Sequence, residues 1–383
     1  MKQIHMPIGV MGCLPKMPVD YPINHPENAG NMVHANAPFK ILHSAYFIKD
    51  YNYRSLGYTD FVDFVNRKCS HLIITLSNTL KLNDPDDSKY KRLFGFLLKI
   101  EKPVIVFGLG IQAKNIDIDS AILPQTAIEL VKYLSSKSVL LGVRGEITKM
   151  IVDKLCGINN SYVTGCPSIF TDIESVYRVR ENMKKNYGIP LFSGTRYFDD
   201  EEGRLLMQSI DDDSWLLEPV NKYNHKFYLK SITNTSSYED IPYYLKKKIN
   251  KNDLKAIYKV TEYFKKRYRL FRNIDDWYQF NRDSVSFSYG TRFHVNMATL
   301  ISGKPALWIT HDSRTQELVD FMCLPNISID KAQYMSCSEF YALTNYEEFF
   351  DNYSYLIENF KRYLNANDLF DNILIKQKGI GKK

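Results

Sequence analysis

The fold is decided by the stretch SVSFSYGTRFHVNMATLISGKPALWITHDSRTQELVDFMCLP, residues 284–325. Alternating apolar residues at 285–289 predict a strand, residues 293–302 predict a helix that ends at a Gly-Lys-Pro, and residues 306–310 predict a second strand. A strand, a helix and a strand in close succession indicate a βαβ unit. In such units ligands bind at the carboxyl ends of the strands.

Arg292 and His294 stand where the first of these strands turns into the helix, with Phe293 between them to anchor the turn in the core. The first N–H groups of a helix are unpaired and carry a partial positive charge, so that a phosphate or carboxylate can bind there beside both side chains. The alternative is an arginine in a surface ion pair and a histidine that satisfies the helix end.

The first half of the chain alternates between strand-like and helix-like segments. Apolar runs of strand length occur at 72–76, 103–108 and 139–143, and helical patterns lie between them at 90–99 and 121–134. This order predicts a parallel sheet with helices on both faces.

The second half repeats this alternation less regularly after a charged segment at 174–187 that we interpret as a link. A chain of 383 residues suits two domains. We therefore expect two doubly wound α/β domains facing a cleft, which is a glycosyltransferase-B-like architecture. The expected parts are an N-terminal domain at 1–180, a C-terminal domain at 181–345, and a C-terminal helix with a basic tail at 346–383 that packs back across both.

Arg144 directly follows the apolar run at 139–143, which points it toward the carboxyl edge of the predicted sheet. A guanidinium group matches a carboxylate or a phosphate through two parallel hydrogen bonds. Arg144 is therefore a candidate anion ligand. The alternative is a structural pair with Glu146.

The loop GLGIQ at 108–112 also follows a strand. Gly108 and Gly110 would let the backbone approach a phosphate closely, and Gln112 would supply a donor, whereas the alternative is tight packing. Because position 113 is Ala, the full G-x-G-x-x-G is absent, and a dinucleotide-binding dehydrogenase is disfavoured.

A Pro-rich loop, HPENAGNMVH at 25–34, opens the first domain. Its polar residues Asn28, Gly30, Asn31 and His34 are well placed to contact an acceptor. An ordinary turn before a capped helix is the alternative.

Composition bounds the remaining partners. Six cysteines are scattered, without a C-x-x-C pair or a Cys/His cluster at metal spacing, and we expect buried thiols and no metal. Neither a signal peptide nor an apolar run of bilayer length is present, so we expect a cytoplasmic protein.

The net charge of +7 favours anionic partners. The basic stretch at 246–272 reads as a solvated helix face, or as contact with an anionic membrane at its inner face, and not as a nucleic-acid site.

Four motifs together resemble the polysaccharide pyruvyl transferase family. Arg292-Phe293-His294, then a helix, Gly303-Lys304-Pro305 and a strand match the family's Arg-x-His region in order. Three further matches lie upstream in the family's order: Asn28-Ala29-Gly30-Asn31, where the family more often has Asp at the place of Asn31; Gly108-Leu109-Gly110-Ile111-Gln112; and Val143-Arg144-Gly145-Glu146 with Val163-Thr164-Gly165-Cys166-Pro167-Ser168.

The resemblance implies a phosphoenolpyruvate donor and a sugar that receives a pyruvate ketal, for a capsule, an exopolysaccharide or another cell-surface glycan. Arg292 and Arg144 would bind the two anionic groups, and His294 would serve the proton or the leaving phosphate. The acceptor would be a sugar or a lipid-linked oligosaccharide, and no cofactor is expected. A sugar-nucleotide glycosyltransferase of the same fold, and a catalytically inactive binding protein of a glycan locus, stay open as alternatives.

Overall fold

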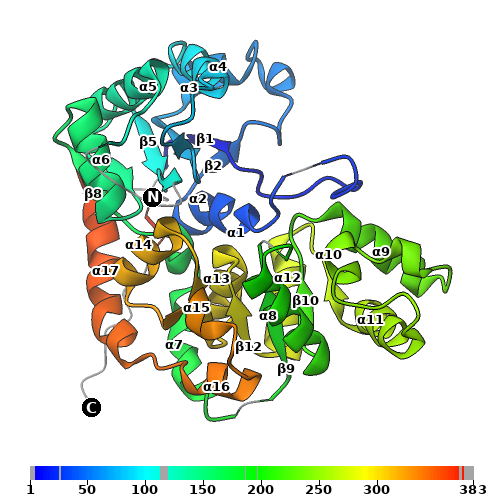
Figure 1. The fold of residues 1–383 in the computed structure, drawn as a ribbon. Coiled ribbons are helices and arrows are strands. Elements are labelled where there is room, and N and C mark those ends of the chain that lie inside the picture. Colours follow the sequence, from blue (N-terminus) through cyan, green and yellow to red (C-terminus); the bar gives the residue numbers. More distant parts are fainter. Residues whose placement is uncertain are drawn as a thin grey trace.

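Two parallel sheets, one in each half of the chain, form the framework of the molecule (Figure 1). The computed structural model describes residues 5–25, 27–112, 120–185, 187–195, 197–370 and 373–374. The statements below concern these residues. The basic tail expected after residue 374 lies outside them.

The first sheet has the strand order β2-β1-β3-β5, and all of its pairs are parallel. A bridge between Leu109 and Val143 continues it toward the parallel pair β7 and β8. Its strands are β1 (Ile8–Gly12), β2 (Ala45–Phe47), β3 (His71–Thr75), β5 (Val104–Phe107), β7 (Leu141–Val143) and β8 (Ser161–Val163), and a small separate pair is formed by β4 (Leu80–Lys81) and β6 (Ile111–Gln112).

Side chains from alternate positions of β3 enter two different cores. Ile73 belongs to one apolar cluster, whereas Leu72 and Ile74 belong to another. A strand that is buried on both faces reads as a continuous apolar run, which is why the sequence predicted it. Helices cover both faces: α1 (Asn31–Ala35), α2 (Ala37–Ile41), α3 (Phe61–Lys68), α4 (Ser88–Leu97), α5 (Gln125–Ser136) and α6 (Glu146–Cys156), with the 3₁₀ turns η1 (Tyr53–Leu56) and η2 (Pro167–Phe170).

The second sheet has six parallel strands in the order β11-β10-β9-β12-β13-β14. Its strands are β9 (Ile189–Ser193), β10 (Trp215–Leu217), β11 (Tyr268–Arg269), β12 (Val285–Gly290), β13 (Ala306–Thr310) and β14 (Asn326–Ser328). Its helices are α7 (Ile173–Asn182), α8 (Asp200–Asp211), α9 (Lys222–Ile232), α10 (Tyr243–Lys246), α11 (Leu254–Arg267), α12 (Ile274–Ser284), α13 (Phe293–Ile301), α14 (Ser313–Met322), α15 (Ile329–Ala332) and α16 (Cys337–Ala342), with the 3₁₀ turn η3 (Tyr238–Asp240).

The last helix, α17 (Glu347–Ala366), connects the two sheets (Figure 1). Near its start the hydroxyl of Tyr346 donates to the carbonyl of Ala306 in β13 over 2.7 Å. Near its end the hydroxyl of Tyr363 donates to the carbonyl of Val106 in β5, also over 2.7 Å. One apolar cluster runs through both halves and includes the buried side of α17.

The predicted fold class is confirmed: two α/β units with parallel sheets stand in a glycosyltransferase-B-like arrangement. The strand, helix and strand of residues 284–325 are β12, α13 and β13. The segment interpreted as a link contains helix α7. The predicted domain boundary near residue 180 falls inside this helix, and it stays a prediction.

Candidate active site

Three arginines from three different segments of the chain meet at one pocket between the two sheets. The pocket has a volume of about 60 Å³, and Arg144, Arg292 and Arg314 line it. Arg144 follows β7, Arg292 follows β12 and Arg314 follows β13. The carboxyl ends of parallel strands from both halves of the chain thus build a single site, as expected for open α/β sheets.

Arg144 has hydrogen-bond donors that are both buried and unused. Its side chain is buried, with 2% of the residue exposed, and its Nη1 donates to Oδ1 of Asn78 over 2.8 Å. Its Nε and Nη2 are buried without a hydrogen-bond partner among the described residues. Glu146, the alternative partner considered from the sequence, is exposed at the start of α6. A buried guanidinium with free donors is expected where an anion binds.

Arg292 is held by the second half of the chain. Its Nε donates to the carbonyl of Gly194 over 2.9 Å, and its Nη2 forms an ion pair with Oε1 of Glu218 over 3.2 Å. Glu218 is fully buried, and this burial raises the pKa of its carboxyl above the ordinary value even though Arg292 acts in the opposite direction. The sequence reasoning missed Glu218. Its position immediately after β10, at a strand end, is the signal that could have found it.

Arg314 begins helix α14 and pairs with Asp312 over 3.1 Å. The same carboxylate caps the helix, since Oδ1 of Asp312 accepts from the backbone N–H of Thr315 over 2.8 Å. The cap fixes the first turn of α14. Arg314 is therefore held at the pocket wall.

The start of helix α13 faces the same pocket, where Phe293, His294 and Val295 form part of the wall. The backbone N–H groups of Val295 and Asn296 both donate to the carbonyl of Arg292. The helix has no side-chain cap among the described residues. The anion site predicted from the sequence at this helix start thus lies beside the three arginines.

A buried carboxylate fixes the two loops of the second half that border the pocket. Glu202 accepts hydrogen bonds from the backbone N–H and the hydroxyl of Thr195, at 3.0 and 2.9 Å. It also accepts from the hydroxyl of Thr291. Both threonines line the pocket. Glu202, which the sequence did not single out, therefore positions the loop that carries Arg292.

The residues predicted for the acceptor divide into two groups. Asn28, Gly30 and Asn31 line the pocket of the three arginines, and Oδ1 of Asn28 accepts from the backbone N–H of Gly30 over 2.9 Å. His34 is fully buried, and it does not belong to the described wall of the pocket. The N-terminal loop therefore forms part of the arginine pocket.

The glycine loop packs against the site residues. Gly108 has a φ of +79°, and a Cβ there would lie 2.6 Å from Cε1 of His34. At Gly110 a Cβ would lie 2.8 Å from Cδ of Arg144. These glycines leave room for His34 and Arg144, and neither belongs to the described pocket wall. The side chain of Gln112 lies outside the described part of the chain.

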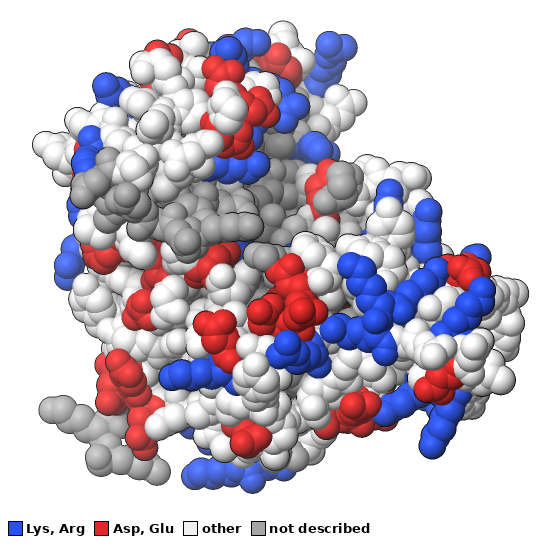
Figure 2. Space-filling model, in the orientation of Figure 1, with Lys and Arg blue, Asp and Glu red and all other residues white. Residues whose placement is uncertain are grey.

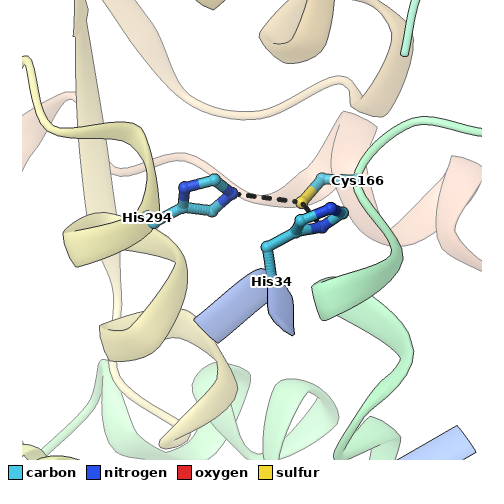
Figure 3. Close-up of side chains that lie close together, drawn as sticks. All are labelled: His34, Cys166 and His294. Carbon is cyan, nitrogen blue, oxygen red and sulfur yellow. Dashed lines mark hydrogen bonds between the residues drawn. The ribbon is translucent and has the colours of Figure 1, made fainter. Parts of the chain in front are cut away.

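His294 points away from the helix toward a buried thiol (Figure 3). Its Nε2 lies 3.5 Å from Sγ of Cys166, and Nδ1 of His34 lies 3.9 Å from the same sulfur. Burial lowers the pKa of His294 well below the ordinary value, and Arg144 lowers it further. In the free protein His294 is thus a neutral imidazole. The sequence analysis expected a buried thiol at Cys166 and included it in one of the family motifs, but gave it no role in the site.

A second, larger cavity adjoins the first and shares Thr195 and Arg292 with it. Its volume is about 520 Å³, and Glu218 also borders it. The aromatic part of its wall consists of Tyr197, Phe198, Tyr223, Tyr243 and Tyr244. The sequence analysis did not find this cavity, because its tyrosines come from three separate segments of the chain.

The comparisons with known proteins concern most of the chain. The family model described as polysaccharide pyruvyl transferase matches residues 28–313. The chain belongs to the polysaccharide pyruvyl transferase family. The resemblance carried by the Arg-x-His and upstream motifs is confirmed, and the chain is a transferase with a pyruvyl transfer role in polysaccharide synthesis.

No curated protein matches this transferase. Among solved structures, UDP-GlcNAc 2-epimerase of Methanocaldococcus jannaschii, in complex with UDP-GlcNAc and UDP, has 10% identity and a TM-score of 0.41 over 85% of this chain and 90% of that chain. MnaA of S. aureus, with UDP, has 12% identity and a TM-score of 0.41 over 95% and 90% of the two chains. The wall teichoic acid polymerase TagF, in its H444N variant, has 10% identity and a TM-score of 0.41 over 95% and 88%. Likenesses of this size carry no argument about function.

The basic stretch of the transferase at 246–272 carries many acidic partners. Lys246 pairs with Glu239 over 3.4 Å, Lys259 pairs with Asp211 over 2.6 Å, and Arg267 pairs with Asp213. Figure 2 shows blue and red residues interleaved over the lobe of α9, α10 and α11. No helix in the described residues is long and apolar enough to cross a membrane. Contact with an anionic membrane stays a prediction.

Proposed function

We propose that this transferase moves the enolpyruvyl group of phosphoenolpyruvate onto two hydroxyls of a sugar and so forms a pyruvate ketal. The observation that carries the proposal is the convergence of Arg144, Arg292 and Arg314 with the start of α13 on one pocket. Phosphoenolpyruvate carries a carboxylate and a phosphate on the same carbon atom. Such a ligand needs several donors and a concentrated positive charge.

The charges around the pocket favour Arg144 as a ligand of one anionic group of the donor. Arg292 and Arg314 each have a carboxylate partner, Glu218 and Asp312. Arg144 has none in the described chain, and two of its donor atoms are unused. We therefore assign one anionic group of the donor to Arg144, and the other to Arg292 with the N–H groups of the helix start.

The reaction proceeds in two balanced steps. A proton is added to the methylene carbon of phosphoenolpyruvate, and a sugar hydroxyl attacks the adjacent carbon and loses its proton. A second hydroxyl then displaces phosphate from that carbon, and its proton leaves with the phosphate or with the base. His294 lies on the pocket wall and serves the proton or the leaving phosphate.

We place the acceptor in the larger cavity. Tyrosine rings with their hydroxyls suit a sugar, because each ring offers an apolar face and a polar edge. Glu218 borders the larger cavity and is paired with Arg292, which lines both cavities, and its raised pKa makes it suited to exchange a proton with an acceptor hydroxyl. Asn28, Gly30 and Asn31, first assigned to the acceptor, are better placed at the donor.

The test is turnover of phosphoenolpyruvate with sugar and lipid-linked oligosaccharide acceptors. Phosphate release should accompany a gain in acceptor mass equal to pyruvic acid less one water. Arg292→Ala should abolish both signals with the fold intact, and His294→Ala should lower turnover more than donor binding. Arg267→Ala, which removes an arginine paired with Asp213 on the surface, is the matched control and should turn over normally. Wild-type turnover in Arg292→Ala would overturn the assignment.

A further inference from the structure

Three side chains that are far apart in the sequence form one buried cluster (Figure 3). They are His34 from α1, Cys166 after β8, and His294 from α13. All three residues are buried, at 0%, 0% and 8% exposed. One nitrogen from each histidine and the sulfur lie within 4.8 Å of one another. The sequence analysis expected no metal site, because any two of these residues are more than a hundred positions apart along the chain.

The distances suit a small tetrahedral cation. In zinc sites the Zn–S distance is about 2.3 Å and the Zn–N distance about 2.0 Å, which places sulfur and nitrogen about 3.6 Å apart at a tetrahedral angle. The observed separations from Sγ of Cys166 are 3.5 Å to His294 and 3.9 Å to His34. Both sulfur–nitrogen separations are thus close to those around a bound cation of this size.

The orientation of His34 is the one that a ligand histidine adopts. Its Nε2 lies 3.1 Å from the carbonyl oxygen of Phe107. Because a carbonyl oxygen only accepts, Nε2 carries the proton and Nδ1 directs its lone pair toward Cys166. Ligand histidines in proteins are usually fixed in this way by a backbone carbonyl or a carboxylate. Gly108 makes this position available, since any Cβ there would collide with the imidazole ring.

Hydrogen bonds through the sulfur of Cys166 are weak. Sγ can donate its one proton to one imidazole nitrogen, and it can accept from an N–H of the other imidazole and from the hydroxyl of Ser168 at 3.0 Å. A thiol is a weak donor, and its sulfur is a weak acceptor. Two imidazole nitrogens and one sulfur are, in contrast, a strong ligand set for zinc-type cations.

We propose that His34, Cys166 and His294 bind a divalent cation of the zinc class. Binding converts the thiol to a thiolate and releases its proton to solvent, so that the thiolate charge offsets part of the charge of the cation and of nearby Arg144. His294 also lines the arginine pocket, and the cation would thus lie next to the anion site. With its Nε2 on the cation, His294 would keep only the second of the two roles proposed above, a contact with the leaving phosphate, and proton transfer would fall to another group such as Glu218. The proposal does not depend on the identity of the donor substrate.

The test uses the full chain, stripped with a chelator and then equilibrated with Zn²⁺ or with Co²⁺ as a spectroscopic probe. We expect one equivalent of bound metal, and a thiolate-to-cobalt charge-transfer absorption that reports a cysteine ligand. Cys166→Ser should remove this absorption and weaken binding by more than about 100-fold, beyond the usual cost of losing an outer-shell partner. Cys156→Ser, which alters a buried cysteine outside the cluster, is the control and should bind as wild type does.

A second variant and the wild-type protein itself test the proposal if Cys166→Ser fails to fold. His294→Gln should shift or abolish the cobalt absorption, because it changes a ligand of the same ion. A folded wild-type protein that binds no metal would overturn the proposal. So would a cobalt spectrum without the charge-transfer band, or one that His294→Gln leaves unchanged.

Discussion

Replacing Arg144 with methionine should make the free protein more stable and the donor complex weaker. The guanidinium of Arg144 is buried with Nε and Nη2 unpartnered among the described residues, and only Nη1 has a partner, Asn78. An unsatisfied buried donor costs about 1 to 3 kcal/mol, and one lost hydrogen bond costs about 1 kcal/mol. Methionine fills a similar volume without donors, so we expect the free energy of unfolding to rise by about 1 to 3 kcal/mol.

The effect on binding has the opposite sign. If the free donors of Arg144 bind an anionic group of phosphoenolpyruvate, their loss should weaken binding by about 2 to 4 kcal/mol. This corresponds to a dissociation constant about 30 to 1,000 times larger.

Urea denaturation gives the unfolding free energy, and calorimetric titration gives the dissociation constant. Arg267→Met is the matched control, because Arg267 already has a carboxylate partner and does not belong to the described wall of either cavity. It should leave donor affinity unchanged and should not stabilise the protein. Lower stability of Arg144→Met together with unchanged affinity would refute the reasoning and make Arg144 a structural residue.

Three further predictions follow from particular contacts. Gly110→Ala should reduce turnover with little loss of stability, because the added Cβ would lie 2.8 Å from Cδ of Arg144 and would displace that side chain. Steady-state kinetics together with urea denaturation would show this, and wild-type kinetics would contradict it. Glu218→Gln should gain stability relative to wild type as the pH rises above about 4.5. Burial raises the pKa of Glu218, so the folded wild type holds this proton more tightly than its unfolded chain does, and the wild type loses stability as the proton leaves. A difference in unfolding free energy between the two proteins that does not change with pH would argue against this. Tyr363→Phe should lower the unfolding free energy by about 1 kcal/mol through the lost bond to Val106 and leave donor affinity unchanged, which denaturation and titration can test together.

Local sequence patterns predicted the parts of the fold that are continuous along the chain. Residues 306–310 are buried on both faces of a parallel sheet and therefore form an uninterrupted apolar run. The strand β1, in the interior of the first sheet, was missed, because its five residues include two glycines and one methionine and carry no period. This segment is a strand because it pairs with β2 and β3, and the local sequence pattern does not predict that pairing.

The same distinction applies to the site. Arg144 and Arg292 could be found because each lies within two residues of a strand end, and strand ends meet at one edge. Glu202 and Cys166 could not, because their roles depend on contacts between distant segments. The glycine loop shows the limit most clearly, since a Gly-x-Gly after a strand predicts either a phosphate loop or tight packing, and only the position of the His34 and Arg144 side chains beside it indicates packing.

The central claim is that the arginine pocket binds phosphoenolpyruvate, and thermal stabilisation of the wild-type protein tests it most directly because it needs no acceptor. Phosphoenolpyruvate would be compared with phosphate, pyruvate, and uridine and guanosine diphosphates, in wild type and in Arg292→Ala. At about 100 times its dissociation constant a ligand stabilises the fold by about 2.7 kcal/mol. The account predicts a shift with phosphoenolpyruvate that is lost in Arg292→Ala. A shift with a nucleoside diphosphate alone would contradict it and would indicate a sugar-nucleotide glycosyltransferase.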